Sequence, residues 1–421
     1  MNEKLFIVLA STIVAVYTKG HDVTVQLDTK TTLNVIGLEH PFVCVNFDWW
    51  PDLKCDYGNC SWVDNGINNL NFDSEILLQA AGALATPALN NGAHFGLLRV
   101  GGSLQDHVHY DFTASTEHCD HDYPMKLDPS DHLGFDQGCV TTQKRDSIRA
   151  FAKATGMKVI FGLNGLVGRT KNEPYWNYTG DWDATQAQKL LIEWGNGLFA
   201  VELGNEIAGR HGVTAHLEAA QYARDFAHLI RMRDGLNLNG KPLVFGVDNS
   251  PDIKWMDQFL GNLTKVSNGS IDAFTWHSYP LGAGAMDKVD SEIMDPTFCT
   301  KVIKVATELQ QWSADKSFPL WMGETGGAYN SGRNTVTNRF MSAFWYLDWM
   351  GILSAHGHKA FCRQTLLGGN YGLLQNTNGT IEVNPDFWGA KLFTDLMRGN
   401  IVKGRTHKCI MSVICVFVSH Q

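Results

Sequence analysis

Short apolar runs that favour β-strands recur along the chain and alternate with segments of helical periodicity. The apolar runs cover residues 42–50, 95–102, 157–164, 199–206, 242–249, 271–279, 319–327 and 359–369. Residues 214–235 and 298–313 instead place apolar side chains at i, i+3, i+4 and i+7, which predicts amphipathic helices. Runs that are apolar throughout are typical of strands buried on both faces, as in parallel sheets. Eight such strands alternating with helices predict a (β/α)8 barrel, an α/β fold.

Two of these apolar runs carry a glutamate where the strand ends. The fourth finishes at Asn205-Glu206, and the seventh contains Glu324. In a (β/α)8 barrel the carboxyl ends of the strands form the active face, so both carboxylates are expected at one rim. A single glutamate at a strand end is more often a cap or an ion-pair partner. Two of them, on strands four and seven, favour glycoside hydrolysis, which needs one carboxyl to protonate the leaving oxygen and another to attack or to activate water.

The other strand ends are also rich in aromatic and polar residues. They are Asp48-Trp49-Trp50, Arg99 with Ser103, Asn164, Trp276-His277 and Arg363-Gln364. Aromatic faces pack against the C–H surfaces of sugars, and amides, carboxylates and hydroxyls bind their hydroxyl groups. For any one aromatic residue, packing within the barrel remains the alternative, and His277 on its own is more typical of a hydrogen-bonded core histidine. Together these residues predict a carbohydrate-binding rim.

Charge and length narrow the function classes. The 421 residues carry a formal charge of −9, without a basic run that could follow a phosphate backbone, so nucleic-acid binding is not expected. The chain is longer than one core usually allows, which predicts a large domain with a partial second one.

The amino end is typical of a secretory signal peptide. Residues 1–20 place Lys4 before an apolar stretch and a polar break, although a buried N-terminal strand is the alternative. That stretch is too short for a confident membrane span, so membrane association is expected to be peripheral at most. The chain also has five sequons for N-glycosylation, at Asn59, Asn177, Asn262, Asn268 and Asn378. These features predict a secreted protein of the cell wall, or one routed to a vacuole or lysosome, and a monomer is expected.

The nine cysteines are too widely spread for a zinc site. Disulfides between Cys55 and Cys60, or between Cys119 and Cys139, are compatible with the sequence, but spacing alone does not derive them. No metal and no organic cofactor are implied, because two carboxylates suffice for the chemistry.

Several motifs together resemble one known family. They are LLRVGGSLQDHVHYD (97–111), VELGNE (201–206), WHSYPLGAG (276–284), WMGETGGAYNSGRN (321–334) and CRQTLLGGNYGLL (362–374). In this order they resemble the plant branch of the heparanase-like β-glucuronidases, glycoside hydrolase family 79, from about residue 43 to about residue 397. The resemblance implies a retaining mechanism, in which Glu206 is the general acid/base and Glu324 is the nucleophile.

The resemblance also implies which residues bind the substrate. Asn205 matches the residue that hydrogen-bonds the sugar 2-hydroxyl, and Tyr329 is expected to orient the nucleophile. Gly332 and Gly369 mark backbone amides that are expected to bind the uronate carboxylate. Asp48, Ser103 and Tyr371 match positions that line the sugar subsite. Asn164, His277 and Tyr279, which lie at or just after predicted strand ends, are also expected to bind the sugar.

The sequence departs from the family at three places. Animal heparanases carry basic residues around the cleft, whereas residues 281–292 bring one lysine among several acids, which disfavours a sulfated polymer. Plant members usually have His-His-x-Tyr-Asn where this chain has Trp276-His277-Ser278-Tyr279-Pro280. The family also builds a β-sandwich from an early segment and a long C-terminal stretch. Here residues 21–40 supply early strands, 41–398 form the predicted barrel, and 399–421 suit only one or two strands, as expected of a truncated chain.

Three functions therefore remain open. The first is an exo-acting β-glucuronidase on plant cell-wall glycans or small glucuronides, with endo-type heparanase activity disfavoured. The second is an inactive or folding-defective relative that binds glycans at most. The third is another retaining β-glycosidase, which would not need the uronate carboxylate.

Overall fold

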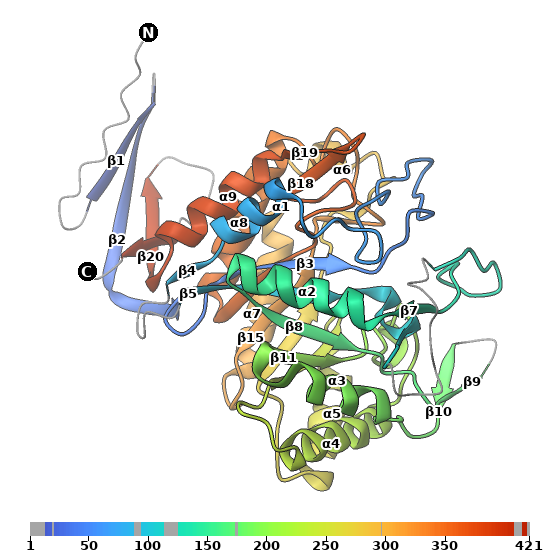
Figure 1. Ribbon diagram of the computed structural model, residues 1–421. Helices are drawn as coiled ribbons and strands as arrows, with labels where there is room; N and C mark the ends of the chain where they lie inside the picture. The colour runs from blue at the N-terminus through green and yellow to red at the C-terminus, as the bar shows by residue number, and fades with distance from the viewer. Residues whose placement is uncertain are drawn as a thin grey trace.

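Eight parallel strands form a closed barrel at the centre of the protein (Figure 1). The computed structural model describes residues 13–18, 21–87, 94–112, 125–172, 176–295, 297–407 and 415–418. The barrel strands are β3 (Val43–Asp48), β5 (His94–Gly101), β8 (Met157–Leu163), β11 (Leu198–Leu203), β12 (Leu243–Asn249), β13 (Ala273–His277), β15 (Leu320–Thr325) and β17 (His358–Arg363). Each overlaps one of the eight predicted apolar runs, and pairing of β3 with both β5 and β17 closes the ring. The (β/α)8 prediction is confirmed.

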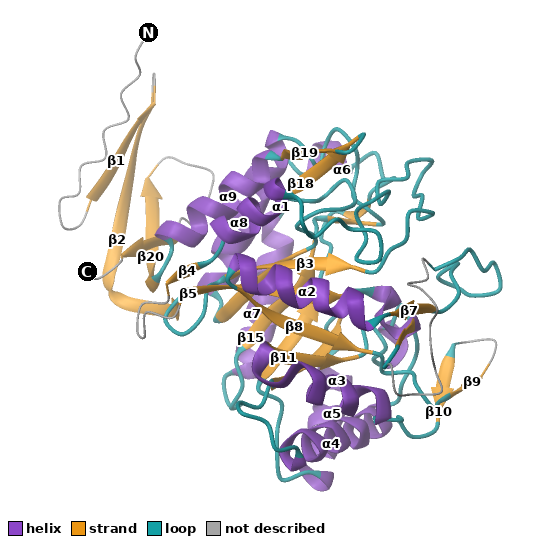
Figure 2. Ribbon diagram, viewed as in Figure 1, coloured by secondary structure: helices purple, strands orange, loops and turns teal. Residues whose placement is uncertain are grey.

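A helix follows each barrel strand and packs on the outside of the ring (Figure 2). These helices are α1 (Glu75–Ala83), α2 (Thr142–Thr155), α3 (Thr185–Trp194), α4 (Ala219–Gly235), α5 (Ile253–Val266), α7 (Cys299–Ser313), α8 (Phe340–Ala355) and α9 (Pro385–Leu396). Both predicted amphipathic helices are present, as α4 and α7. However, α4 begins five residues later than its periodicity suggested, at Ala219. The preceding residues bind the loop after β11 instead, since Thr214 N donates to Glu206 O at 3.0 Å and Leu217 N to Ile207 O at 2.9 Å.

The interior of the barrel changes from apolar to polar along its axis. One end is filled by a separate apolar cluster that includes Cys44, Leu97, Ile160, Ala200, Phe245 and Trp321. On three strands the residue two positions after a member of this cluster is polar and buried. These polar residues are Asn46 after Cys44, Arg99 after Leu97 and Glu202 after Ala200. Because side chains two apart on a strand share a face, one continuous inner surface carries both layers. The polar layer lies toward the carboxyl ends, where the candidate site is expected.

A disulfide between Cys44 and Cys362 joins strands β3 and β17 inside the barrel. The sequence did not indicate this pair, because its members are 318 residues apart. Of the two disulfides considered from spacing, Cys55–Cys60 is confirmed. Cys139 is disulfide-bonded, but Cys119 lies outside the described residues.

A second sheet lies beside the barrel, next to helices α8 and α9 (Figure 1). Its strand order is β1 (Ile13–Thr18), β2 (His21–Ile36), β20 (Gly399–His407) and β21 (Cys415–Val418), all antiparallel. The prediction that the segments before and after the barrel form strands is therefore confirmed. Part of the predicted signal peptide, residues 13–18, forms strand β1 of this sheet, as the alternative of an N-terminal strand expected. Residues 1–12 lie outside the described residues, and the signal peptide stays a prediction.

Within the ranges that the structure describes, no helix is both long and apolar enough to cross a bilayer.

Candidate active site

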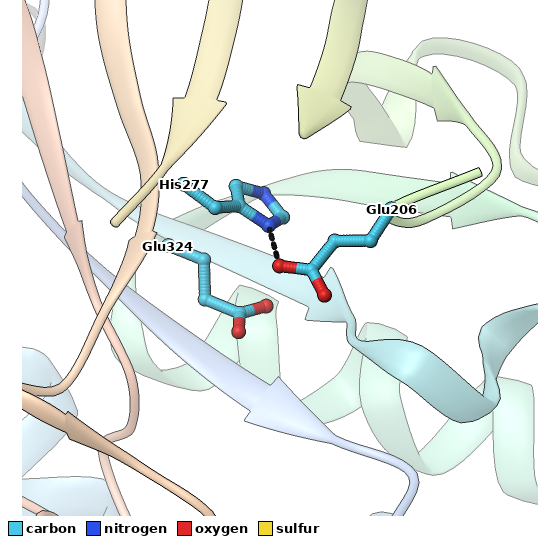
Figure 3. Close-up of side chains that lie close together, drawn as sticks. All are labelled: Glu206, His277 and Glu324. Carbon is cyan, nitrogen blue, oxygen red and sulfur yellow. Dashed lines mark hydrogen bonds and ion pairs between the residues drawn. The ribbon is translucent and has the colours of Figure 1, made fainter. Parts of the chain in front are cut away.

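Glu206 and Glu324 extend from opposite strands toward one another at the carboxyl end of the barrel (Figure 3). Glu206 follows β11 in the left-handed region, at φ 52°. Its N–H donates to Asp248 O at 2.8 Å, and its carbonyl accepts from Val213 N at 2.7 Å. Glu324 lies in β15 and is 6% exposed. The backbone on both sides of the site is therefore held by neighbouring strands and loops, which limits movement of the two carboxyl groups.

The two carboxyl groups are close enough for a direct displacement at carbon. One oxygen from each glutamate and a ring nitrogen of His277 all lie within 4.8 Å of one another. In retaining glycosidases the two carboxyl groups are about 5 to 5.5 Å apart, whereas inverting enzymes need about 6.5 to 9.5 Å to admit a water. The spacing fits the retaining geometry.

Arg99 connects three acceptors beneath the two glutamates. It is completely buried, and it donates from Nε to Glu202 at 2.6 Å, from one amino nitrogen to Glu324 Oε2 at 2.9 Å and from the other to Asn205 Oδ1 at 2.8 Å. Burial and the neighbouring charge of Asp248 raise the pKa of Glu202 to about 8, against the opposing effect of Arg99. The planar guanidinium thus fixes both the nucleophile candidate and the residue before Glu206. Sequence reasoning noted Arg99 only as a strand-end residue.

His277 lies between Glu206 and Asp248. Its Nδ1 is 3.0 Å from Glu206 Oε1, and its Nε2 is 3.3 Å from Asp248 Oδ1. Burial lowers the pKa of His277, but the charge of Glu324 and the two hydrogen bonds outweigh burial and raise it to about 10. Both nitrogens therefore donate from an imidazolium at neutral pH. The structure gives His277 a positioning role, because neither nitrogen is left for a substrate.

The tyrosine that contacts Glu324 differs from the one expected. Tyr279 donates its hydroxyl to Glu324 Oε1 at 2.5 Å. Tyr329, which was expected to orient the nucleophile, packs edge-on against Tyr279 with ring centroids 6.4 Å apart, and is 43% exposed. The difference arises because strands β14 (Gly282–Ala283) and β16 (Ala328–Tyr329) pair and hold these two loops side by side, a pairing that no local sequence pattern indicates.

A cavity of about 520 Å³ opens above the two glutamates. Of the predicted sugar-binding residues, those that line it are Asp48, Ser103, His277, Tyr279, Tyr329 and Tyr371. Gln364, a predicted residue of the carbohydrate-binding rim, also lines it, and so does Lys54, which was not predicted. Asp48 accepts from Gln364 Nε2 at 2.6 Å, and burial together with the charge of Glu324 raises its pKa to about 8.

Asn205 is fully buried and directly precedes Glu206, which lines this cavity. Its N–H donates to Asp106 Oδ2 at 2.8 Å, and its side-chain Oδ1 accepts from Arg99. The side-chain Nδ2 has no hydrogen-bond partner within the described part of the chain. Since a buried amide is rarely left unpaired, this nitrogen is a candidate donor to a sugar hydroxyl.

Comparison with known proteins agrees with this geometry. Residues 22–351 match the model of the glycosyl hydrolase family 79 N-terminal domain. The chain belongs to glycosyl hydrolase family 79. It is 38% identical to heparanase-like protein 3 of Arabidopsis thaliana over 86% of this chain and 65% of that one. It is 32% identical to baicalin-beta-D-glucuronidase of Scutellaria baicalensis over 88% of this chain and 70% of that one. The chain thus spans about two thirds of the length of these relatives.

The solved structures that resemble this family 79 chain support the fold. A 4-O-alpha-L-rhamnosyl-beta-D-glucuronidase from Fusarium oxysporum superposes with a TM-score of 0.58, covering 91% of this chain and 78% of that one at 16% identity. An alpha-L-arabinofuranosidase from Thermotoga maritima gives a TM-score of 0.55 over 91% and 75%, at 14% identity.

Three residues expected at the family 79 sugar site lie elsewhere. The Asn164 side chain donates to Val108 O at 3.1 Å and accepts from Leu166 N at 2.9 Å, which shapes a loop. Gly369 donates its N–H to Ser61 O at 3.1 Å and lines a different cavity. Gly332 does not line the catalytic cavity, but its neighbours Asn330 and Ser331 do.

Glu206, His277 and Glu324 are spaced as metal ligands could be. A histidine must be neutral to bind a metal, and His277 is held in its charged form by three carboxylates. The donor set therefore fits a hydrogen-bonded acid pair better than a metal centre. The expectation that no metal is used stays a prediction.

The five sequons differ in accessibility. Asn177, Asn268 and Asn378 are exposed. Asn59 and Asn262 are partly buried, and their amides donate to Asn370 Oδ1 at 3.3 Å and to Gln258 O at 2.7 Å. Glycosylation is thus sterically easiest at the first three sites.

Proposed function

We propose that the protein is a retaining exo-β-glucuronidase that acts on plant cell-wall glycans or small glucuronides. The observation that carries this proposal is the spacing of Glu206 and Glu324, whose oxygens approach within 4.8 Å across the mouth of the barrel. A family 79 relative at 32% identity named as a β-D-glucuronidase supports the choice of sugar.

In the first step, ionised Glu324 attacks the anomeric carbon while Glu206 transfers its proton to the leaving oxygen. The bond to the aglycone breaks, and the sugar becomes an ester of Glu324. His277 holds Oε1 of Glu206, which leaves Oε2 to carry the transferred proton. Asn205 Nδ2 donates to the sugar 2-hydroxyl, a contact that strengthens as charge develops on the ring.

In the second step, Glu206 takes a proton from water, and the resulting hydroxide displaces Glu324 from the anomeric carbon. The configuration at that carbon is thereby inverted twice and retained overall. Arg99 and Tyr279 donate to the two oxygens of Glu324, so they stabilise the carboxylate that this step releases.

The turn after β16 (Ala328–Tyr329) is the proposed binding site for the uronate carboxylate. Three successive residues are left-handed there, namely Asn330 at φ 55°, Ser331 at 64° and Gly332 at 73°. Such turns direct neighbouring N–H groups to one side and can bind an anion. Lys54 adds a cation on the same cavity, with Nζ 4.3 Å from the Trp50 ring centroid and 3.0 Å from Asp56 Oδ1.

The alternatives differ in observable ways. Another retaining β-glycosidase would accept a substrate whose carboxylate is replaced by hydroxymethyl, and an inactive relative would hydrolyse neither. Endo-type action on a sulfated polymer is disfavoured by the acidic segment 281–292. The disulfides and exposed sequons also support passage through the secretory pathway, to the cell wall, vacuole or lysosome.

Hydrolysis of p-nitrophenyl β-glucuronide by the secreted protein tests the proposal. Glu206→Gln should lower kcat/KM by about 10² to 10⁴, since a general acid contributes that much. Glu324→Gln should be inactive, and azide should restore turnover of Glu324→Ala by replacing the missing nucleophile. Activity of the unmutated protein on p-nitrophenyl β-glucoside but not on the glucuronide would overturn the sugar assignment, and wild-type rates in both glutamine variants would overturn the mechanism.

A further inference from the structure

A second cavity, of about 660 Å³, contains none of the catalytic carboxyl groups. It is lined mainly by polar side chains, among them His107, His109, Asp128, Asp131, Asp136 and Gln137. Carboxylates, imidazoles and amides are groups that bind sugar hydroxyls, and the volume is within the usual range of ligand sites. The proposed mechanism does not use this cavity.

One short contact separates the second cavity from the catalytic one. Val213 is 50% exposed and lines the catalytic cavity, and its carbonyl accepts from His132 Nε2 at 2.8 Å. His132 directly follows Asp131, which lines the second cavity. Val213 also donates its N–H to the carbonyl of Glu206 at 2.7 Å. The two cavities are thus neighbours, and the wall between them is attached to the backbone of the proposed acid/base.

Trp176 covers this wall. Its ring stacks on His132 with centroids 4.3 Å apart and planes inclined by 22°. The His216 ring also lies near it, with centroids 6.5 Å apart and planes inclined by 58°, yet Trp176 is 37% exposed, so part of the residue is open to solvent. Trp176 adopts a left-handed φ of 49°, which is uncommon for a bulky residue and is often found at functional sites.

The hairpin that carries Trp176 lies on the catalytic side of the barrel. Strands β9 (Thr170–Asn172) and β10 (Asn177–Thr179) project beyond the carboxyl ends of the barrel strands (Figure 1). Tyr178, in β10, lines the second cavity. Strand β10 therefore contributes to the cavity, and the partly exposed Trp176 directly precedes it.

We propose that Trp176 and the second cavity bind the aglycone part of the substrate, and that this part is a neutral oligosaccharide. The inference rests on the proposed function, because a general acid at Glu206 protonates the leaving oxygen and the aglycone therefore lies on the same side of the glycosidic bond as Glu206. A chain of sugars leaving the catalytic cavity past Glu206 crosses Val213, stacks on Trp176 and reaches the polar cavity.

The charge of the cavity selects a neutral ligand. Among the described residues that line it are four aspartates, at positions 106, 128, 131 and 136, but only two cationic side chains, Arg169 and Lys171. One of those cations, Arg169, is already paired with Asp225 at 2.6 Å. An excess of negative charge repels uronates and sulfates but accepts hydroxyl donors.

A buried histidine adds an unused polar atom. His107 is 7% exposed and lies 3.3 Å from Asp131 through Nε2, while its Nδ1 has no hydrogen-bond partner among the described residues. A sugar hydroxyl in the cavity would supply that partner.

Binding of neutral sugars tests the site without catalysis. Galactotriose, xylotriose, cellotriose and the anionic trigalacturonate are titrated by calorimetry into the full chain. At least one neutral trisaccharide should bind, and Trp176→Ala should weaken it about tenfold, as expected for loss of an aromatic contact of about 1.4 kcal/mol. Trp176→Phe should restore part of the affinity, and Trp388→Ala, which removes a 64% exposed tryptophan on α9, should change nothing. Binding that is equal in Trp176→Ala, absent, or strongest for trigalacturonate would overturn the proposal.

Kinetics separate this site from the catalytic one. For Trp176→Ala, kcat/KM should fall about tenfold on glucuronic acid linked to the bound trisaccharide, but stay within twofold on methyl β-glucuronide. Equal losses on both substrates would overturn the aglycone assignment. If the unmutated protein hydrolyses neither substrate while Trp176→Ala still loses trisaccharide binding, the proposed function fails and the sugar-binding site stands.

Discussion

Replacing Tyr279 by Phe isolates one hydrogen bond of the proposed nucleophile. The change removes the hydroxyl that donates to Glu324 Oε1 at 2.5 Å and keeps the ring. Burial and the charge of Glu324 hold the pKa of Tyr279 well above its usual range, so the hydroxyl stays a donor at every working pH. A hydrogen bond to a charged group contributes about 1.5 to 3 kcal/mol, which corresponds to a roughly 10- to 150-fold loss of kcat.

The loss should appear in kcat, because the hydroxyl stabilises the carboxylate that is released when the glycosyl-enzyme is hydrolysed. Steady-state kinetics on p-nitrophenyl β-glucuronide measure it, with Tyr329→Phe as the matched control. Tyr329 lines the same cavity but packs against Tyr279 rather than bonding Glu324, so its change should mainly affect KM. A larger drop of kcat in Tyr329→Phe than in Tyr279→Phe would refute the reasoning.

Two further predictions concern stability. Changing both Cys44 and Cys362 to Ala removes a bridge that spans 318 residues, so the free energy of unfolding measured in guanidinium should fall by about 6 kcal/mol. Removing the other described disulfide, which spans five residues, should cost about 2 kcal/mol, and the reverse order would contradict the entropic account. Separately, burial lowers the pKa of His277, but Glu324, Asp248 and Glu206 raise it to about 10. The stabilisation of the folded state by charged His277 is complete below about pH 6.5 and is lost as pH rises through about 10. The urea midpoint of unfolding should therefore fall over that pH range, and it should fall less in His277→Asn.

The barrel and its glutamate pair could be predicted because both are local patterns. A run such as residues 199–206 must be apolar to be buried on two faces, and its last residues must face the rim. Structure then places β11 at Leu198–Leu203 with Glu206 just beyond it. The places of the strands along the chain and of the two carboxylates follow from the sequence alone, although some predicted runs extend past the strand ends, as 359–369 does past β17.

Contacts between strands could not be predicted in the same way. The partners of Arg99 are Glu202, Asn205 and Glu324, which lie more than 100 positions further along the sequence. An arginine inside an apolar strand indicates only that it has some partner, not which one. Tyr279 and Tyr329 both follow strands that end at the rim, so only the pairing of their loops decides which one contacts Glu324. The sequence predicted that the N–H of Gly369 binds an anion, but in the structure this N–H donates to the carbonyl of Ser61 instead.

The buried charges of the site depend on the apolar layer beneath them. Arg99, Glu202 and Asn46 are almost fully buried, and burying charged or polar groups is unfavourable even when they are paired. On the same faces of the same strands, two residues earlier, Leu97, Ala200 and Cys44 belong to the apolar cluster. The disulfide at Cys44 joins β3 to β17, the two strands whose ends carry Asp48 and Gln364. The apolar cluster and the disulfide therefore offset the unfavourable burial of the polar layer above them. Together they form a rigid frame that holds the carboxyl groups of Glu206 and Glu324 at the separation that the proposed direct attack requires.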